Sequence, residues 1–464
     1  MTRGLAMRTA VAGVAIGIAY VLSPLTVWFT LAMCVLVPRA VAGIRGEERR
    51  WVLALLIGAI VLRVMAVGAL FLLTNHAQTP FGSFFGDEEY FIKRSIWLRN
   101  VALGIPIHGA DLIYAFDEYS ATSYLYVLAF IQVLVGPAPY GVHLLAIGCY
   151  VAGCALMFRI ARGAFGRMPA IGGLVLLLFY PTQFAWSISA LKDPLFFLLS
   201  AVTLWCAVRL VRGPSWPARI GALAAIVAIA GMLETVRAAG VILTVASIAV
   251  GLSVAALVLR PRLLLAATIA MPLVVGFALS RPIVQLKLYA SIQAAARQHW
   301  GHIATAGYVY KLLDQRLYEG KIDIDDLQFG EAARFVVRAV TRYVTVPLPW
   351  EVRSTAALLY LPEQLLWYLL VALVPLGVVG SCRRDPVVGS LLLGYALCAA
   401  LTVAMTSGNI GTLVRHRGLA LPYIVWLSAV GACDSIRWWS RRRVEGRLTA
   451  DRGPVSLEVH PTWP

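Results

Sequence analysis

Long apolar runs recur along most of this chain, and short polar connections separate them. The hydrocarbon core of a membrane is about 30 Å thick and needs roughly 20 apolar residues per helix, whereas one soluble core cannot bury so many runs. With 60% hydrophobic and 14% charged residues, the chain is predicted to be an all-α polytopic membrane protein. The predicted spans are residues 51–74, 140–160, 170–190, 195–211, 220–235, 239–259, 263–279, 356–380, 387–406 and 419–433.

Arginines lie in every second connection between these spans. Membrane proteins retain positive charge on the cytoplasmic side, so these connections are predicted to be cytoplasmic, and two long loops, residues 75–139 and 281–355, to face outward. We therefore expect a multi-pass protein of the bacterial inner (plasma) membrane. Because the net charge of +17 lies beside apolar runs, no nucleic-acid partner is predicted. The arginines are Arg45, Arg49, Arg50, Arg159, Arg162, Arg167, Arg209, Arg212, Arg219, Arg260, Arg262, Arg383, Arg384, Arg437, Arg441, Arg442 and Arg443.

The same pattern divides the chain into five regions. Residues 1–50 are predicted to form a membrane hairpin broken at Ser23-Pro24, with one tilted helix as the alternative, and residues 51–280 a transmembrane module whose first outer loop is residues 75–139. Residues 124–135 are apolar but too short to cross at about 1.5 Å per residue, so we expect them to dip into the outer leaflet. A second outer loop (281–355), C-terminal spans (356–436) and a cytoplasmic tail (437–464) follow.

Two segments have the residue spacing of helices that lie along a membrane surface. Residues 90–103 interleave apolar side chains with Lys93 and Arg94, and residues 329–346 do the same with arginines four positions apart. The basic side chains of the first segment are candidates to bind lipid head groups or a substrate phosphate. The alternative for the first segment is a plain interfacial anchor.

Three consecutive acids, Asp87, Glu88 and Glu89, follow the first span on its outward side. Carboxylates at a membrane interface are costly unless they bind a cation or transfer protons. Sugar transfer, for example, needs a carboxylate that takes the acceptor's proton, and a divalent metal, Mg²⁺ or Mn²⁺, would offset a phosphate leaving group. Asp87 and Glu88 are therefore candidate catalytic groups and candidate metal ligands; the alternative is a solvated turn that caps the next helix.

A second charged group lies at outward turns later in the chain. Lys192 and Asp193 precede Pro194, which suits the first turn of a helix, so the alternatives are a helix cap or a place in the same cavity as Asp87. Arg237 is a candidate substrate ligand, although the favoured interpretation pairs it with Glu234.

Arg415, His416 and Arg417 lie together in the last outward loop, where the orientation rule disfavours positive charge. Planar guanidinium groups bind phosphate with two N–H donors, so both arginines are predicted ligands of a donor phosphate. His416 either titrates near neutral pH or acts as an ordinary hydrogen-bonding residue.

The order of these motifs resembles family C (GT-C) membrane glycosyltransferases, above all the group of protein O-mannosyltransferases and lipid A aminoarabinose transferases. The resemblance covers residues 51–280 and rests on the Asp87-Glu88 loop, the apolar half-helix ending in Gly136, and three later motifs. These are Phe165-Gly166-Arg167, Tyr180-Pro181 and Lys192-Asp193-Pro194. The C-terminal third is more like proteins of bacterial exopolysaccharide clusters.

The resemblance implies a GT-C-like helical bundle and inverting transfer of a sugar from a polyprenyl-phosphate donor. It further implies that Asp87 is the catalytic carboxylate, Glu88 its neighbour and Asp193 a second acid at the cavity. The acceptor would be a glycan, a lipid or a protein on the outer face, in assembly of the cell envelope or an exopolysaccharide. We expect membrane lipids as further partners.

Two other functions remain open from the sequence. A Wzy-like polymerase that joins lipid-linked repeat units would also use outward arginines, but would depend less on the early acids. A transporter or flippase for lipid-linked sugars predicts functional charges near the bilayer centre, where Arg63 is the candidate. The transferase hypothesis requires Asp87, Asp193 and Arg415 to face one cavity.

Overall fold

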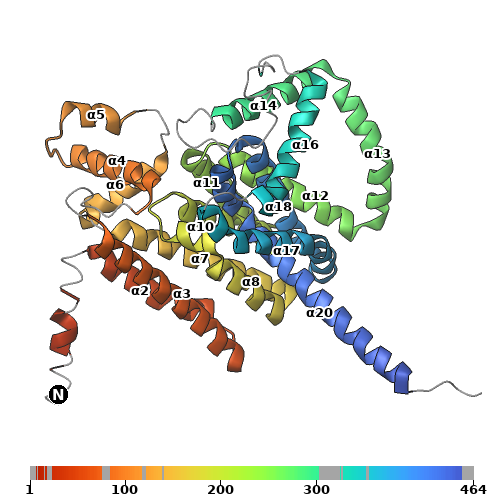
Figure 1. The fold of residues 1–464 in the computed structure, drawn as a ribbon, viewed down its shortest axis with the longest axis horizontal. Helices are drawn as coiled ribbons and strands as arrows, with labels where there is room; N and C mark the ends of the chain where they lie inside the picture. The colour runs from red at the N-terminus through yellow and green to blue at the C-terminus, as the bar shows by residue number, and fades with distance from the viewer. Residues whose placement is uncertain are drawn as a thin grey trace, which may run out of the picture.

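The computed structural model describes residues 7, 9–14, 16–17, 23–75, 84–117, 122–137, 140–301, 324, 328–351 and 355–451. Most of these residues lie in helices. These residues contain no β-strand, and the helices form one irregular bundle (Figure 1). Among the described residues, seven helices are long and apolar enough to cross a membrane. The protein is therefore an all-α polytopic membrane protein, as predicted. The seven are α3 (Gly46–Leu73), α7 (Gly141–Phe165), α10 (Asp193–Arg212), α11 (Trp216–Val236), η1 with α12 (Ile242–Leu259), α17 (Thr355–Arg384) and α18 (Pro386–Thr406).

The other three predicted spans correspond to pairs of helices that are bent where they join. The bend is 62° between α8 (Arg167–Phe179) and α9 (Pro181–Ser187), and 86° between α13 (Pro261–Leu279) and α14 (Pro282–Gly301). It is 68° between residues 410–419, which hold α19 (Ile410–His416) and η3 (Arg417–Leu419), and α20 (Leu421–Asp451). Proline lies in the first turn of the second helix at all three joints, at Pro181, Pro282 and Pro422, where the missing N–H is tolerated.

Ion pairs join the basic connections to one another at one end of the bundle. Arg162 at the end of α7 binds Glu48 at the start of α3, at 2.6 Å, and Arg212 at the end of α10 binds Asp385 before α18, at 2.5 Å. Arg384 at the end of α17 binds Asp434 of α20. We call this region the basic end.

Helix α2 (Pro24–Ala40) lies along α7 and runs in the same direction. Thr26 near its start donates to the Tyr140 hydroxyl before α7, and Arg159 near the end of α7 donates to the carbonyl of Arg39. Helix α2 begins at Pro24, and Ser23 before it has extended backbone; the hairpin stays a prediction. Most of the first half of the predicted hairpin lies outside the described residues.

Three helices of the first predicted outer loop lie together at one edge of the bundle (Figure 1). They are α4 (Gly86–Ala102), α5 (Gly109–Ala115) and α6 (Ser123–Val135). Helix α6 is too short to count as a span, as its apolar sequence predicts, and it packs against α4 and α11. Helix α4 starts earlier than the predicted segment 90–103, so that the acids Asp87 and Glu88 form its first turn.

Close helix contacts at the centre of the bundle depend on residues without side chains. A Cβ on Gly377 of α17 would collide with the backbone of Leu427 in α20, and a Cβ on Gly173 of α8 would collide with the ring of Trp426. Small residues allow such close approach of membrane helices. These contacts hold α20 against α17 and α8; α9 follows α8 in the chain, and α19 precedes α20.

The structure adds detail to two predicted segments of the C-terminal half. The amphipathic segment 329–346 is a helix, α16 (Phe329–Thr345), but its apolar face packs against α18 inside the protein, because Phe335 and Tyr343 are buried there. The short η2 (Pro349–Glu351) follows. The predicted tail 437–464 begins as a continuation of α20, which extends as a helix to Asp451.

Candidate functional site

Charged side chains from four separate segments meet at the end of the bundle opposite the basic end. Arg415 binds the Asp87 carboxylate through Nη1, and its Nη2 lies 3.4 Å from Oδ2 of Asp193. Nη2 of Arg237 lies 2.5 Å from Oδ1 of Asp193. Asp193 begins α10, which has 20 residues and ends at Arg212, so about 30 Å of helix separates this site from the basic end. Together with Lys192, these residues form what we call the charge cluster: Asp87, Lys192, Asp193, Arg237 and Arg415.

Helix ends position each member of the cluster. Asp87 and Asp193 lie in the first turns of α4 and α10, where the partial positive charge of a helix N-terminus favours a carboxylate. Arg415 lies in the last turn of α19, whose start is capped by the Asn409 side chain, which accepts the Thr412 N–H at 2.7 Å. Arg237 directly follows α11. The expected Arg237–Glu234 pair is wrong, since the Glu234 carboxylate accepts the N–H of Val241 at 2.8 Å instead.

The cluster has one exposed carboxylate and one enclosed carboxylate. The Asp87 side chain is 67% exposed, whereas Asp193 is 20% exposed and lies between Arg237 and Arg415, at 13% and 19%. Charges interact more strongly away from bulk water, and an enclosed carboxylate needs its partners. Asp193 is therefore committed to holding two guanidinium groups, while Asp87 is open to a substrate.

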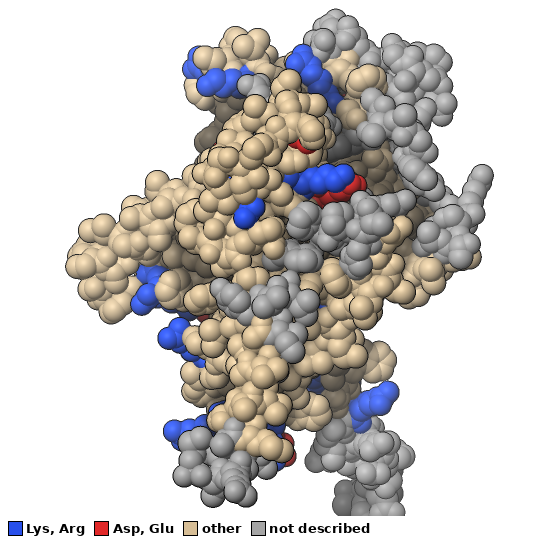
Figure 2. All heavy atoms as spheres, turned by 90° about the vertical axis from the view of Figure 1, so that its left-hand side faces the viewer, with Lys and Arg blue, Asp and Glu red and all other residues tan. Residues whose placement is uncertain are grey.

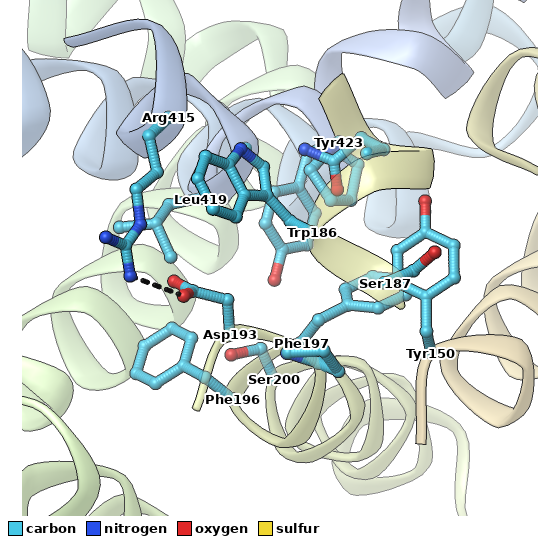
Figure 3. Close-up of a pocket in the computed structure, with 14 residues that line it drawn as sticks. Tyr150, Trp186, Ser187, Asp193, Phe196, Phe197, Ser200, Arg415, Leu419 and Tyr423 are labelled. Carbon is cyan, nitrogen blue, oxygen red and sulfur yellow. Dashed lines mark hydrogen bonds and ion pairs between the residues drawn. The ribbon is translucent and has the colours of Figure 1, made fainter. Parts of the chain in front are cut away.

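A narrow cavity lies beside Asp193 and Arg415 (Figure 3). Its volume of about 30 Å³ is room for one or two water molecules. Figure 3 shows the Asp193–Arg415 pair at one side of the cavity and Tyr150 with Ser187 at the other. Aromatic rings make up much of the wall. The lining residues are Tyr150, Gln183, Trp186, Ser187, Asp193, Pro194, Phe196, Phe197, Ser200, Arg415, Gly418, Leu419, Pro422 and Tyr423.

Buried N–H groups around this cavity lack acceptors. Nε1 of Trp186, Nε of Arg237 and Nε of Arg415 are buried, and the described part of the chain offers none of them a hydrogen-bond partner. The Arg415 guanidinium lies over the Trp186 ring, 4.8 Å from its centre, which fixes the direction of both groups. Buried donors are normally satisfied, so this arrangement suits a ligand rich in negatively charged acceptor atoms.

Lys192 adds a titratable positive charge next to Asp193. Burial, together with the nearby Arg237 and Arg415, lowers its pKa to about 8, although Asp193 acts in the opposite direction. The ammonium group is therefore charged at neutral pH and loses its proton in mildly basic solution. The cluster then carries three positive and two negative side chains at neutral pH.

Glu88 does not share the surroundings of Asp87. Its Oε2 lies 2.9 Å from Nε2 of His143 at the start of α7, and both side chains are fully buried. The same oxygen accepts the N–H of Phe84 at 3.3 Å, and the Phe84 ring packs on the imidazole with 4.2 Å between centres. These contacts tie the first turn of α4 to α7, so Glu88 and His143 fix the backbone that carries Asp87.

A broken span lies next to the cavity. Pro181 has no N–H, so the carbonyl of Leu177 lacks its helical donor, and the Tyr150 hydroxyl donates to it at 2.5 Å. The N–H of Thr182 turns to the Glu363 carboxylate at 3.0 Å. That leaves the Leu178 carbonyl without its own helical partner.

Arg63 of α3 supplies the missing donor. Its Nη2 donates to the Leu178 carbonyl and its Nε to the Ser187 hydroxyl, both at 2.7 Å, and the side chain is fully buried. Membrane helices tolerate breaks where other groups satisfy the freed backbone. Arg63 and Tyr150 thereby hold α9 in place, and α9 carries Trp186 and Ser187 of the cavity wall.

Four other residues were predicted to bind substrate but make none of the cluster's ion pairs. They are Lys93, Arg94, His416 and Arg417. Arg94 is buried under α5 and donates to the carbonyls of Ala115 and Asp117, and Lys93 pairs with Glu89 on the exposed face of α4. His416 lies beside the Ser407 hydroxyl, with 3.5 Å between Nδ1 and Oγ.

Arg417 turns away from Arg415 and is almost fully buried. Its guanidinium donates to the carbonyls of Tyr343 and Val346 and to Gln364, and it lies over the Trp367 ring. It joins α16 and α17 to the end of α19, which gives it a structural role in this arrangement.

The residues present do not fit the expected divalent metal. Asp87 binds an arginine and Glu88 binds His143, and within the described ranges no group of three or more His, Cys, Asp or Glu side chains is placed to hold an ion. Asp193 lies between two arginines and Asp87 binds one of them, and these positive side chains repel a second cation. The metal stays a prediction.

Sequence reasoning did not single out His143, Trp186 or Tyr150 as site residues. Each lies in an apolar run, where a histidine or an aromatic residue is ordinarily interpreted as packing. The available signal was the histidine at the outward start of a span, since a buried imidazole needs a partner.

Comparisons with protein-family models, with curated proteins and with solved structures found no match for this chain.

Proposed function

We propose that this protein is a membrane glycosyltransferase that moves a sugar from a polyprenyl-phosphate donor to an acceptor hydroxyl at the charge cluster. The observation that carries the proposal is the combination of an exposed carboxylate, Asp87, with buried and unpaired N–H donors on Arg237 and Arg415. A phosphate supplies the acceptor atoms that these donors lack, and a carboxylate can take a hydroxyl proton.

The charges of the cluster match this chemistry. Three positive and two negative side chains leave one positive charge, which a singly charged phosphodiester balances. When the bond to the sugar breaks, the departing polyprenyl phosphate gains a second negative charge. Lys192, Arg237 and Arg415 stabilise that developing charge, and fixed positive groups of this kind are the usual source of such stabilisation.

Donor binding also frees the base. Arg415 binds the Asp87 carboxylate, and the cavity beside it admits only a water or two. A donor phosphate competes with Asp87 for Arg415, so the carboxylate is released when the donor is in place. Asp87 then faces the acceptor as an unpaired base.

The reaction is a single displacement. The acceptor oxygen forms a bond to the anomeric carbon while the bond from that carbon to the phosphate oxygen breaks, and the acceptor's proton goes to Asp87. Attack from the side opposite the phosphate inverts the anomeric centre. Glu88 and His143 position Asp87 through the first turn of α4.

The proposed site faces outward from a bacterial inner membrane. The basic end carries the arginines that are retained in the cytoplasm, and the charge cluster lies at the other end of α10. A polyprenyl tail would lie among the membrane lipids, and a glycan, lipid or protein acceptor would approach from outside. Assembly of the cell envelope or of an exopolysaccharide is the process that this placement serves.

Transport of a lipid-linked sugar is a second candidate, favoured by the broken span α8–α9 and the buried Arg63. Discontinuous helices and charges within the membrane are typical of transporters. Arg63, however, already donates to the carbonyls of Ala59 and Leu178 and to the Ser187 hydroxyl. Movement of a labelled lipid-linked sugar between leaflets without release of polyprenyl phosphate would support transport over transfer.

Binding of undecaprenyl phosphate, the product common to donors of any sugar, tests the proposal. The protein in nanodiscs should bind undecaprenyl phosphate more tightly than undecaprenol, and Arg415→Gln should weaken that binding about 10-fold or more, as loss of a charged hydrogen-bonding group does. Arg441→Gln, on the exposed part of α20, is the control. Equal binding of the two lipids, or no change in Arg415→Gln, would overturn the proposal.

A further inference from the structure

A second cavity lies at the basic end, between the last turns of α7 and α10 and the start of α18. Its volume is about 320 Å³, which is far larger than that of the cavity beside Asp193. The lining residues are Leu156, Arg159, Ile160, Gly163, Ala164, Trp205, Val208, Arg212, Asp385 and Val388. Arg212 and Asp193 are the two ends of α10, so this crevice is separate from the charge cluster.

The charged residues of the crevice leave positive charge available. Asp385 binds Arg212 at 2.5 Å and also accepts the N–H of Val388 at 3.0 Å, so its carboxylate is committed to Arg212 and to capping α18. Arg159 is exposed and donates through Nη1 to the carbonyl of Arg39. A backbone carbonyl does not neutralise a guanidinium, so Arg159 retains its full charge.

The rest of the crevice is apolar and lies on helices that span the membrane. Leu156, Ile160 and Val208 are half-buried, and Val388 is buried. The Trp205 ring is partly exposed and carries the Arg209 guanidinium 4.6 Å from its centre. Tryptophan and arginine together are typical of the depth where lipid head groups meet acyl chains.

We infer that this crevice binds an anionic phospholipid, with the phosphate at Arg159 and the first part of an acyl chain against Leu156, Ile160 and Val208. A soluble anion would use the arginine but not the apolar wall, and a neutral lipid would use the wall but not the charge. Basic pockets between membrane helices are known to hold acidic head groups. The lipid would lie against α7, α10 and α18, which together line the crevice.

The glycine in the wall allows a test that leaves every charge unchanged. Gly163 has open space around the position of a Cβ, so Gly163→Leu fills the crevice without a clash. Gly221 of α11 has the same open surroundings outside the crevice, and Gly221→Leu is the matched control. Arg159→Gln removes the charge, with Arg441→Gln as its control.

The experiment is native mass spectrometry of the full-length protein released from detergent, titrated with dioleoyl phosphatidylglycerol or dioleoyl phosphatidylcholine. We expect tighter binding of phosphatidylglycerol, and a loss of about 10-fold in both Arg159→Gln and Gly163→Leu, because a charged hydrogen bond and steric access are each required. Neither control should change the affinity. Excess inorganic phosphate should compete weakly, since it lacks the acyl chain.

Equal affinity for the two lipids would overturn the inference, and so would unchanged binding in Gly163→Leu. A loss of affinity in Arg159→Gln alone would indicate a general attraction of acidic lipids to the basic end. That result would also contradict a specific site in the crevice. Undecaprenyl phosphate binding at Arg415 is measured separately, so either proposal can fail without the other.

Discussion

The two ends of α10 use the same chemistry in different ways. At the basic end three arginines each bind a carboxylate of their own: Arg162 binds Glu48, Arg212 binds Asp385 and Arg384 binds Asp434. At the charge cluster, Arg237 and Arg415 share Asp193, and Arg415 reaches Asp87 as well. Space-filling atoms in Figure 2 show lysine and arginine at several levels of one face, with acidic atoms beside only some of them.

A carboxylate shared by two arginines distinguishes the charge cluster from the structural ion pairs at the basic end. A one-to-one pair satisfies both partners and joins two elements, so a ligand gains little by breaking it. In the cluster, the N–H groups outnumber the carboxylate oxygens that face them, and the Nε atoms of both arginines are left unpaired. A phosphate therefore completes the arrangement at the cluster, whereas the one-to-one pairs at the basic end are already complete.

The largest expected effect is on transfer in Asp87→Asn. Removing the proposed base should lower the transfer rate by roughly 10³-fold, since general bases contribute about 10²- to 10⁴-fold. The thermal midpoint should hardly move, because Asp87 is mostly exposed. Glu89→Gln, two residues along the same helix, is the control and should retain activity. Full activity of Asp87→Asn would remove the proposed role of the cluster.

Arg237→Gln should weaken undecaprenyl phosphate binding by about 10-fold, because it removes one charged donor and leaves Asp193 to Arg415 alone. Arg162→Gln, which breaks a pair at the basic end, should leave this affinity unchanged. Isothermal titration in nanodiscs measures both. Similar losses in the two variants would mean that the two ends do not differ in the way described here.

The pH dependence of binding should reflect Lys192. Its pKa of about 8 means that the ammonium loses its charge as the pH rises through 8. Affinity for undecaprenyl phosphate should therefore fall over that range and stay level only well below it, where the ammonium keeps its proton. Stability should change in the opposite direction. The unfolded side chain titrates near 10.4 and binds more protons between these values, which favours the folded state as pH rises.

Lys192→Gln separates the lysine from other titrating groups. This variant should bind more weakly at pH 7 by a few fold and should lose the decline near pH 8. A decline that persists unchanged in Lys192→Gln would assign it to another group.

The smallest effect is expected for Glu48→Gln at the basic end. The Arg162–Glu48 pair is partly exposed, and such pairs contribute about 1 kcal/mol or less. The thermal midpoint should drop slightly, with transfer and lipid-phosphate binding unchanged. A large loss of transfer would show that the basic end takes part in the reaction.

The sequence predicted the cluster's members better than their partners. Asp87, Asp193 and Arg415 stood out because charges beside membrane spans are costly, and the structure brings them together. Arg237 was assigned to Glu234 because the two are close in sequence, yet α11 ends between them and directs Arg237 to Asp193. Asp193 is 44 positions from Arg237 and 222 from Arg415. The spacing of residues within a short segment cannot predict contacts over such separations.

Arg415 and Arg417 show the same limit at short range. The sequence treats them as equal phosphate ligands, but α19 ends at His416 and η3 begins at Arg417. The change of helix type sends one guanidinium to the cluster and the other to the carbonyls of Tyr343 and Val346.

Composition and periodicity alone determined that this chain crosses a membrane many times, where the spans lie and which connections are basic, because the hydrocarbon core imposes its length and polarity on every span. Tertiary structure decided which carboxylates are shared between arginines and which form one-to-one ion pairs. It also placed Arg63 and Tyr150 at the break in α8–α9. The reason is physical: a buried donor or charge takes its partner from whichever helix packs beside it, and that neighbour is set by packing of the whole bundle.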